Sequence, residues 1–440
     1  MQALSMAAIF IAATTSLGVA QQLPAPIQED AFHAVDPEEA KLGQLLFYDP
    51  ILSGNREVAC ATCHHPKFGT SDGVSLSFGD GGIGLGSTRR VDPNNRPEQR
   101  IPRNSPALFN LGAKEFTVLF HDGRLEAGPT LPNGIRTPLD ADMVKGFASV
   151  LSAQTMFPVL SRDEMAGSHK ENGIAKLVRQ GVITGKDGAW GQLAQRVAKI
   201  DAYAQRFQAV YPTLNSSNDI AFTDISNAIA AFIELEWRAD NAPFDAVLRG
   251  EGSLSARATS GMKLFYGDAG CATCHSGPFL TDHSFHAMAT PQIGPGKAAS
   301  FEAHQRDEGR FRVTGRDEDR FAFRTPSLRN VALTAPYGHA GAHKDLSAFI
   351  AFHANPVRGL AAYDRTQAAL PPYEDNDFAV LDDPLQVAEI TNAVQAEPVD
   401  LTSNDIAALV AFMNSLTDPI SPNGRLGVPD TVPSGLTVPN

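Results

Sequence analysis

Basic residues are in short supply in this chain of 440 residues, and long apolar runs are almost absent. The 36 Lys and Arg are outnumbered by 49 Asp and Glu, and the resulting net charge of −13 argues against nucleic acid as a partner. Beyond the first 20 residues, no stretch is long and apolar enough to suggest a membrane span. The glycine-rich segment 69–103 lacks a following Gly-Lys-Ser/Thr, which excludes a phosphate-binding loop of that kind.

The apolar opening, residues 1–20, also lacks positive charge, because the first Lys or Arg of the chain is Lys41. The small residues Gly18 and Ala20 nevertheless suit a signal-peptidase site, so we expect a signal peptide over 1–20. A short membrane anchor is the alternative. The Pro- and acid-rich segment 21–36 is predicted to be a linker.

Cysteine is rarer still, and all of it lies in two identical stretches of Cys-Ala-Thr-Cys-His. The residues are Cys60, Cys63 and His64 in the first stretch and Cys271, Cys274 and His275 in the second. In this pattern two thiols can add to the vinyl groups of a haem while the histidine binds the iron axially. Zinc would not require a histidine after each pair, and a thioredoxin-like pair needs a βαβ setting that is not evident here. The sequence therefore predicts two covalently bound haem c groups.

The residues around the two motifs indicate a duplicated, mainly helical unit. Apolar residues recur with a helical period, and capping residues mark the ends of several segments. We expect helices at 37–47, 147–156, 190–210, 220–237, 254–266 and 402–416. Each motif follows a helix that ends in Leu-Phe-Tyr. The predicted fold is mainly α, with two cytochrome-c-like haem domains, long loops and little β structure.

The predicted domains have boundaries at 37–240 for the N-terminal, peroxidatic haem domain and 241–418 for the C-terminal, electron-transfer domain. The Pro-rich tail 419–440 is expected to pack along the surface or to fray, and 292–320 is expected to be an exposed loop. The only two tryptophans, Trp190 and Trp237, are interpreted as core residues.

Several further segments resemble the bacterial di-haem cytochrome c peroxidase family, which includes the methylamine-utilisation enzyme MauG. They are 42–50, 103–106, 120–124, 324–330 and 334–337, and the resemblance extends from about 37 to 416. It implies an N-terminal haem that reacts with hydrogen peroxide, a low-spin C-terminal haem that passes electrons to it, and a calcium ion between the two. It also implies a location in the periplasm, where c-type haem is attached, and a small cytochrome c or cupredoxin as electron donor.

Cleavage of the peroxide O–O bond needs a group that takes a proton from one oxygen and returns it to the other. Gln154 and Glu164, which are ten residues apart, resemble the family's distal glutamine and glutamate. Asp163 is the nearest rival for the acid–base role.

Two departures from the family pattern concern the peroxide-reactive haem. Asp80 stands where many peroxidases of the family have a histidine that caps the iron, so we expect this haem to be open without reductive activation. His65, directly after the proximal ligand, is not expected to reach the opposite face. His121 replaces a tryptophan between the haems; a neutral imidazole carries an electron hole less readily, and a packed, hydrogen-bonded histidine is the other interpretation.

A third departure concerns the sixth ligand of the second haem, which is Met or Tyr in the family. His353 lies at that position, 17 residues after Pro336, with Met288 and His343 as fallback ligands. The resemblance also assigns Asn104, Thr334 and Pro336 to the calcium site, and oxygen donors suit such a hard cation.

These features predict a periplasmic di-haem c-type oxidoreductase that reduces hydrogen peroxide. One alternative is a MauG-like oxidase that modifies a residue of a partner protein. Another is a non-catalytic di-haem electron-transfer cytochrome, against which Glu164 argues. The sequence leaves the identity of the donor, a protein substrate and a homodimer open.

Overall fold

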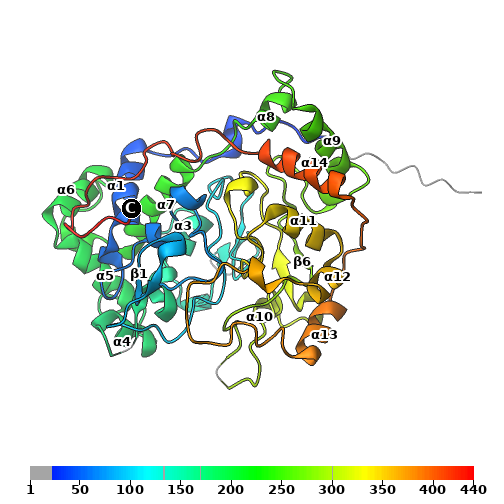
Figure 1. The fold of residues 1–440 in the computed structure, drawn as a ribbon. Helices are drawn as coiled ribbons and strands as arrows, with labels where there is room; N and C mark the ends of the chain where they lie inside the picture. Colours follow the sequence, from blue (N-terminus) through cyan, green and yellow to red (C-terminus); the bar gives the residue numbers. More distant parts are fainter. Residues whose placement is uncertain (1–21, 132–133, 169, 300) are drawn as a thin grey trace, which may run out of the picture.

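The computed structural model describes residues 22–131, 134–168, 170–299 and 301–440 (Figure 1). The predicted signal peptide over 1–20 lies outside these residues. Among the described residues, no helix has both the length and the apolar character needed to cross a bilayer.

Helices carry most of the regular structure in the described residues. They are α1 (Pro37–Tyr48), α2 (Cys60–Cys63), α3 (Val150–Thr155), α4 (Gly173–Arg179), α5 (Ala189–Ala198), α6 (Asp201–Val210), α7 (Phe222–Glu236), α8 (Pro243–Leu248), α9 (Ala256–Tyr266), α10 (Phe311–Thr314), α11 (Leu346–Ala354), α12 (Pro356–Ala361), α13 (Pro384–Asn392) and α14 (Ser403–Asn414). The predicted mainly α fold with little β structure is confirmed.

The strands are short and form three small antiparallel sheets. They are β1 (Gly82–Ile83) with β2 (Arg90–Val91), β3 (Val118–Leu119), β4 (Leu125–Ala127) and β5 (Ile135–Arg136) together, and β6 (Phe285–Ala287) with β7 (Ala322–Arg324). The long segment 69–103 is mostly loop, as expected. The boundaries of the two haem domains stay a prediction.

The same glycine contact occurs ahead of each haem motif. In α1, a Cβ atom at Gly43 would lie 1.8 Å from the carbonyl oxygen of Ala228 in α7. In α9, a Cβ at Gly261 would lie 1.9 Å from the carbonyl oxygen of Ala408 in α14. Both glycines stand five residues before the tyrosine of the Leu-Phe-Tyr repeat, so the sequence repeat corresponds to a repeated close crossing of two helices.

The structure differs from the sequence-based expectations in three respects. The helix expected over 190–210 is interrupted at Ile200, whose backbone is extended, and α6 then turns the buried side chain of Tyr203 toward Asp49. The short helices α2, α4, α8 and α10–α13 were not predicted. The segment 292–320 is not simply an exposed loop, because Gln292, Asp307 and Glu308 are buried. Asp307 is drawn inward by the guanidinium of Arg103, at 2.6 Å.

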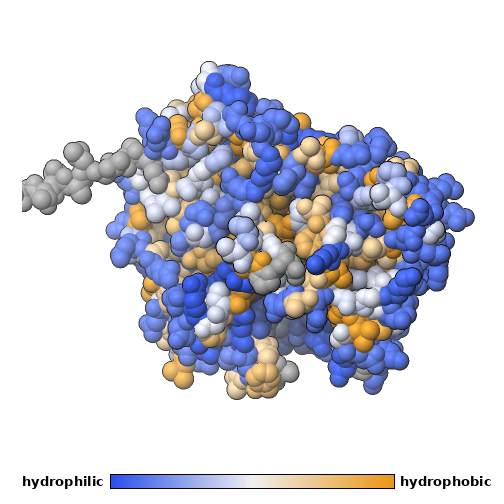
Figure 2. All heavy atoms as spheres, turned by 180° about the vertical axis from the view of Figure 1, so that it is seen from behind, coloured by the Kyte–Doolittle hydropathy of each residue, from blue (hydrophilic) through white to orange (hydrophobic). Residues whose placement is uncertain are grey.

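Both tryptophans are core residues, as predicted. Trp237 is fully buried, and the almost fully buried Trp190 donates its indole N–H to the carbonyl oxygen of Met156. They belong to the largest apolar core, to which α1, α3 and α5–α7 contribute; α9 and α14 form a second core. The face opposite to that of Figure 1 is mostly hydrophilic, with its hydrophobic residues scattered in small groups (Figure 2).

The Pro-rich tail packs along the surface of the N-terminal half, and the C-terminus lies close to α1 (Figure 1). The buried carboxylate of Glu236 accepts hydrogen bonds from the backbone N–H groups of Arg425, Leu426 and Gly427. Farther along, the Ser434 hydroxyl donates to Asp49 at 2.7 Å. The segment predicted as a linker is also partly packed, since Phe32 is buried.

We expect Glu236→Ala to lower the free energy of unfolding by about 2–3 kcal/mol, because three tail N–H groups lose their acceptor. The midpoint of urea denaturation, followed by circular dichroism, measures this change. The control is Glu251→Ala, which removes an exposed ion pair with Arg249 and is expected to change the midpoint little. Equal midpoints for the two variants would show that the tail contacts contribute nothing.

Candidate functional site

The first Cys-Ala-Thr-Cys-His motif begins with the helical turn α2, and His64 directly follows it. The Nδ1 atom of His64 lies 3.0 Å from the carbonyl oxygen of Thr70. Because a carbonyl can only accept, Nδ1 carries the proton and Nε2 keeps its lone pair for a metal. Cys60 and Cys63 form no disulfide, and burial raises the pKa of each thiol to about 12.

A large cavity opens beside this motif, with about 1160 Å³ of empty space including the part open to solvent. Its walls are largely apolar side chains from α1, α3 and α7 and from the segment 101–108. The polar and ionisable lining residues are Cys60, Cys63, His64, Asp72, Arg103, Asn104, Ser105, His121, Arg124, Gln154, Thr155, Glu164 and Lys297. Two thiols and an imidazole at one apolar cavity form the donor set that a haem c requires.

Glu164 and Gln154, the predicted distal pair, both line this cavity. Glu164 belongs to a π-helical turn, Arg162–Ala166, a rare form that recurs at functional sites. Burial raises the pKa of Glu164, while the nearby cations Arg124 and Lys297 act to lower it. Gln154, from α3, has a buried Oε1 atom without a hydrogen-bond donor among the described residues.

The rival carboxylate, Asp163, is engaged elsewhere. It accepts hydrogen bonds from Gln99 at 2.8 Å and from Arg162 at 3.0 Å, and it is not among the residues that line the cavity. The geometry therefore favours Glu164 over Asp163 for contact with a molecule in the cavity.

Arg103 anchors the cavity to the C-terminal half. Its guanidinium pairs with Asp122 at 2.7 Å and with Asp307 at 2.6 Å, and all three side chains are buried. Burial alone would raise the pKa of Asp307, but Arg103 holds it at about 2. The sequence around 103–106 drew attention to this arginine only through the family resemblance, and no local pattern pointed to Asp307.

His121, in place of the family's tryptophan, lines the cavity and is hydrogen-bonded. Its Nε2 donates to the carbonyl oxygen of Asn104 at 3.1 Å, and its own carbonyl accepts from the backbone N–H of Arg324. Burial and the charge of Arg103 lower the pKa of His121 to about 4, so the ring is neutral near pH 7. This agrees with the interpretation as a packed, hydrogen-bonded histidine.

Asp80 does not line the cavity. Its carboxylate accepts hydrogen bonds from Asn55 and Asn95, and burial raises its pKa to about 6. Its backbone N–H donates to the carbonyl oxygen of Glu164 at 2.9 Å, which ties the loop around 80 to the π-helical turn. His65 is also absent from the lining; its Nδ1 accepts from the backbone N–H of Lys67.

The second motif begins with a 3-10 turn over Cys271–Thr273. His275 Nδ1 donates to the carbonyl oxygen of Leu280 at 3.1 Å, which again leaves Nε2 for a metal. The centres of the His275 and His353 rings are 6.3 Å apart. Two imidazoles on opposite sides of one metal ion have ring centres about 6 Å apart, because each metal–nitrogen bond is about 2 Å long.

Of the two fallback ligands, His343 lies among other aromatic rings. His343 packs against the rings of Phe349, Phe352 and Tyr363, at centroid distances of 5.0–5.4 Å, and no ring contact with His275 is found. Met288 is partly buried beside β6. His353, in α11, has a buried Nδ1 atom without a partner among the described residues.

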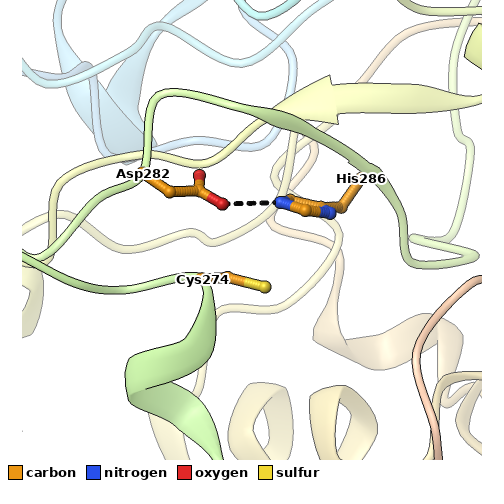
Figure 3. A group of neighbouring side chains, drawn as sticks. All are labelled: Cys274, Asp282 and His286. Carbon is orange, nitrogen blue, oxygen red and sulfur yellow. Dashed lines mark hydrogen bonds and ion pairs between the residues drawn. The ribbon is translucent and has the colours of Figure 1, made fainter.

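Figure 3 shows a further group beside the second motif, in which His286 donates to Asp282 at 2.8 Å and the Cys274 thiol lies close by. The ligand atoms of these three residues lie within 4.8 Å of one another. If haem is attached covalently, the Cys274 thiol becomes a thioether and no longer binds a metal ion as a thiolate. We therefore interpret these three residues as part of the second haem site. Among the described residues, no group brings the four cysteines together, which argues against the four-thiol zinc alternative.

The predicted calcium residues are only partly informative. Asn104 uses its side-chain Nδ2 to donate to the carbonyl oxygens of Val74 and Ser75, which leaves Oδ1 for a cation. The Thr334 hydroxyl donates to the carbonyl of Val331. Pro336 is the third residue assigned to this site. Calcium binding by the three residues stays a prediction.

Several residues that line the cavity had no role assigned from the sequence, among them Asp72, Arg124, Met165 and Lys297. Met165 directly follows Glu164, and its thioether is a potential haem ligand. Lys297 is 133 residues from Glu164 along the chain, so no spacing pattern could have linked the two.

Comparison with known proteins gives a consistent picture. A sequence model described as di-haem cytochrome c peroxidase matches residues 37–253. The methylamine utilization protein MauG of Methylorubrum extorquens is 27% identical over 380 residues, which are 86% of this chain and 84% of that protein. Cytochrome c551 peroxidase of Pseudomonas aeruginosa is 28% identical over 338 residues, covering 77% of this chain and 78% of that protein.

Two solved structures are also similar to this chain over most of its length. A MauG-like protein associated with microbial copper homeostasis is 26% identical, with a TM-score of 0.56, and the match covers 93% of this chain and 96% of that one. The di-haem peroxidase BthA of Burkholderia thailandensis has a TM-score of 0.60 at 18% identity, with 92% and 93% covered, which shows the likeness of fold. Together with its two haem motifs, these matches show that the chain belongs to the di-haem cytochrome c peroxidase family of oxidoreductases.

Proposed function

We propose that this protein is a periplasmic di-haem peroxidase that reduces hydrogen peroxide at the N-terminal haem site, with electrons relayed from the C-terminal site. One observation carries the proposal: Glu164 and Gln154 line the same cavity as the haem-attachment residues of the first motif. The overall reaction takes one hydrogen peroxide, two electrons and two protons to two waters. A haem held by Cys60, Cys63 and His64 supplies the redox chemistry.

Glu164 has the environment of a general acid–base. As a carboxylate it can accept a proton from one oxygen of the peroxide, and as a carboxylic acid it can return that proton to the oxygen that leaves as water. Gln154 offers an amide that can hydrogen-bond and orient the substrate. The apolar walls of the cavity limit the access of bulk water to the reacting groups.

At the C-terminal site, we propose that His275 and His353 are the two axial ligands of the second haem. Their ring separation of 6.3 Å supports this pairing. A small periplasmic cytochrome c or a cupredoxin is the proposed electron donor, and a basic donor would be attracted by the net charge of −13.

A MauG-like oxidase, which modifies a residue of a partner protein, is the second candidate function. Asp80 favours it, because this residue is held by Asn55 and Asn95 outside the cavity and does not cap the haem site. The replacement of tryptophan by His121 argues against it. A pure electron carrier would need a sixth ligand in the first cavity, and the Met165 thioether and the His121 imidazole are lining groups of that type.

The proposed function is tested with the haem-loaded protein, a reduced artificial donor and hydrogen peroxide. We expect donor oxidation in a ratio of two electrons per peroxide, without any protein partner. If both haems cycle with ferricyanide and dithionite but peroxide is not consumed, the peroxidase proposal is wrong.

We expect Cys271→Ala, and more strictly Cys271→Ala with Cys274→Ala, to lose one of two covalently bound haems. Haem remaining on the polypeptide after acid–acetone extraction measures this, since thioether bonds survive the treatment. Ser276→Ala, beside the motif, is the control and should retain both haems. Complete extraction of haem from the unmodified protein would disprove covalent attachment.

A further inference from the structure

The N-terminal cavity is completed by one residue from the C-terminal half. Among the described residues that line it, Lys297 is the only one beyond Ile233 in the chain. It lies in the segment between β6 and α10, far from the π-helical turn in sequence.

The segment that carries Lys297 is fixed on both sides. Before it, Ile293 is buried in an apolar cluster with Leu76, a residue of the loop after the first haem motif. Gln292 exchanges two hydrogen bonds with the backbone of Asp307, at 2.9 and 2.8 Å. Asp307 in turn binds Arg103 in the cavity wall. Lys297 is therefore held at the cavity by contacts with the N-terminal half.

Two carboxylates line the cavity: Asp72, which accepts a hydrogen bond from the backbone N–H of Val74, and Glu164, whose charge acts on Lys297. Arg103 is neutralised by two aspartates, and Arg124 pairs with Asp122 at 3.1 Å. Among the described residues, neither Lys297 nor Glu164 forms an ion pair within 4.0 Å, and both line the same cavity.

We propose that Lys297 is a positioning residue that holds Glu164 in its carboxylate form, so that the C-terminal half of the chain sets the pH range in which the N-terminal site accepts a proton. This inference rests on the proposed role of Glu164 as the distal base.

The physical basis is the interaction of opposite charges in a partly desolvated cavity. Burial raises the pKa of Glu164 and Asp163 adds to this, whereas Arg124 and Lys297 oppose it. Without the Lys297 cation, burial would raise the pKa of Glu164 further. The Glu164 carboxylate would then form only at a higher pH. The Lys297 side chain is exposed to solvent, which screens its charge. The change in the pKa of Glu164 should therefore lie toward the lower end of the range for pairs of opposite charges.

Lys297→Met tests the proposal in the haem-loaded protein, with Lys297→Arg as the charge-conserving variant. The rate of cyanide binding is measured against pH by stopped-flow absorption. Hydrogen cyanide, like hydrogen peroxide, gives up a proton when it binds the haem iron, so the rate reports the availability of Glu164 as a base. In Lys297→Met we expect a rate about tenfold lower on the acid side, near pH 5–6, and an unchanged rate near pH 9. Lys297→Arg should follow the unmodified protein, and so should Lys186→Met, an exposed lysine of the N-terminal half.

The double variant Lys297→Met with Glu164→Gln separates this role from a structural one. If Lys297 acts through Glu164, the lysine substitution should change nothing in the Glu164→Gln background. An unshifted pH profile in Lys297→Met, or an equal shift in the double variant, would overturn the proposal. Cyanide binding needs no turnover, so a shifted profile in a protein that fails to consume peroxide would support the role of Lys297 while rejecting the peroxidase function.

Discussion

Glu164→Gln is expected to slow the reaction with hydrogen peroxide by a factor of about 10²–10⁴ while leaving both haem spectra nearly unchanged. Glutamine keeps the size of the side chain and one acceptor oxygen but cannot take up and return a proton. The measurement is the rate of the spectral change after mixing the haem-loaded ferric protein with peroxide.

The pH dependence gives a second readout of the same substitution. Burial raises the pKa of Glu164, and the carboxylate is the form that accepts a proton, so the rate in the unmodified protein should rise with pH as this group ionises. Glu164→Gln should lose this acid limb. Asp163→Asn is the matched control, because Asp163 binds Gln99 and Arg162 outside the cavity. A large loss in Asp163→Asn with little change in Glu164→Gln would reverse the assignment.

His353→Ala is expected to convert the second haem from low-spin to high-spin, or to recruit another ligand, and to slow electron delivery more than the initial reaction with peroxide. Imidazole stabilises ferrous iron less than the thioether of methionine does, so the unmodified site should also have a lower potential than a site with a Met ligand. Absorption and electron paramagnetic resonance spectra report the ligand change, and single-turnover kinetics separate the two steps.

The control for this substitution is His343→Ala. His343 packs among aromatic rings close to His353 but shows no contact with His275, so its loss should leave the second haem low-spin. If the ferric protein shows the weak near-infrared band of His–Met ligation, or if His353→Ala leaves the second haem unchanged, the ligand is elsewhere and Met288 is the first candidate.

The sequence was most informative where the chemistry depends on neighbouring residues. The haem motifs, the helices of the repeat and the buried tryptophans could be predicted because each depends on short spacing or on periodicity. The glycines of that repeat, Gly43 and Gly261, also correspond to close helix crossings.

Contacts across long stretches of chain could not be predicted. Asp307 and Lys297 belong to a segment with mixed charge and glycine, and their roles arise only when this segment packs against the loop after the first motif. The burial of 307 and 308 was missed for the same reason: a charged residue is expected at the surface unless its partner is known, and here the partner of Asp307 is Arg103. The break near Ile200 was also missed; after it, α6 brings Tyr203 to Asp49, a partner 154 residues earlier in the chain.

The spectrum of the resting ferric protein bears most directly on the proposal of one open and one bis-histidine haem. Electron paramagnetic resonance of the haem-loaded protein should show one high-spin and one low-spin centre in equal amounts, without prior reduction. Two low-spin centres would contradict this account, because they would place a sixth ligand such as Met165 in the cavity where peroxide is proposed to react.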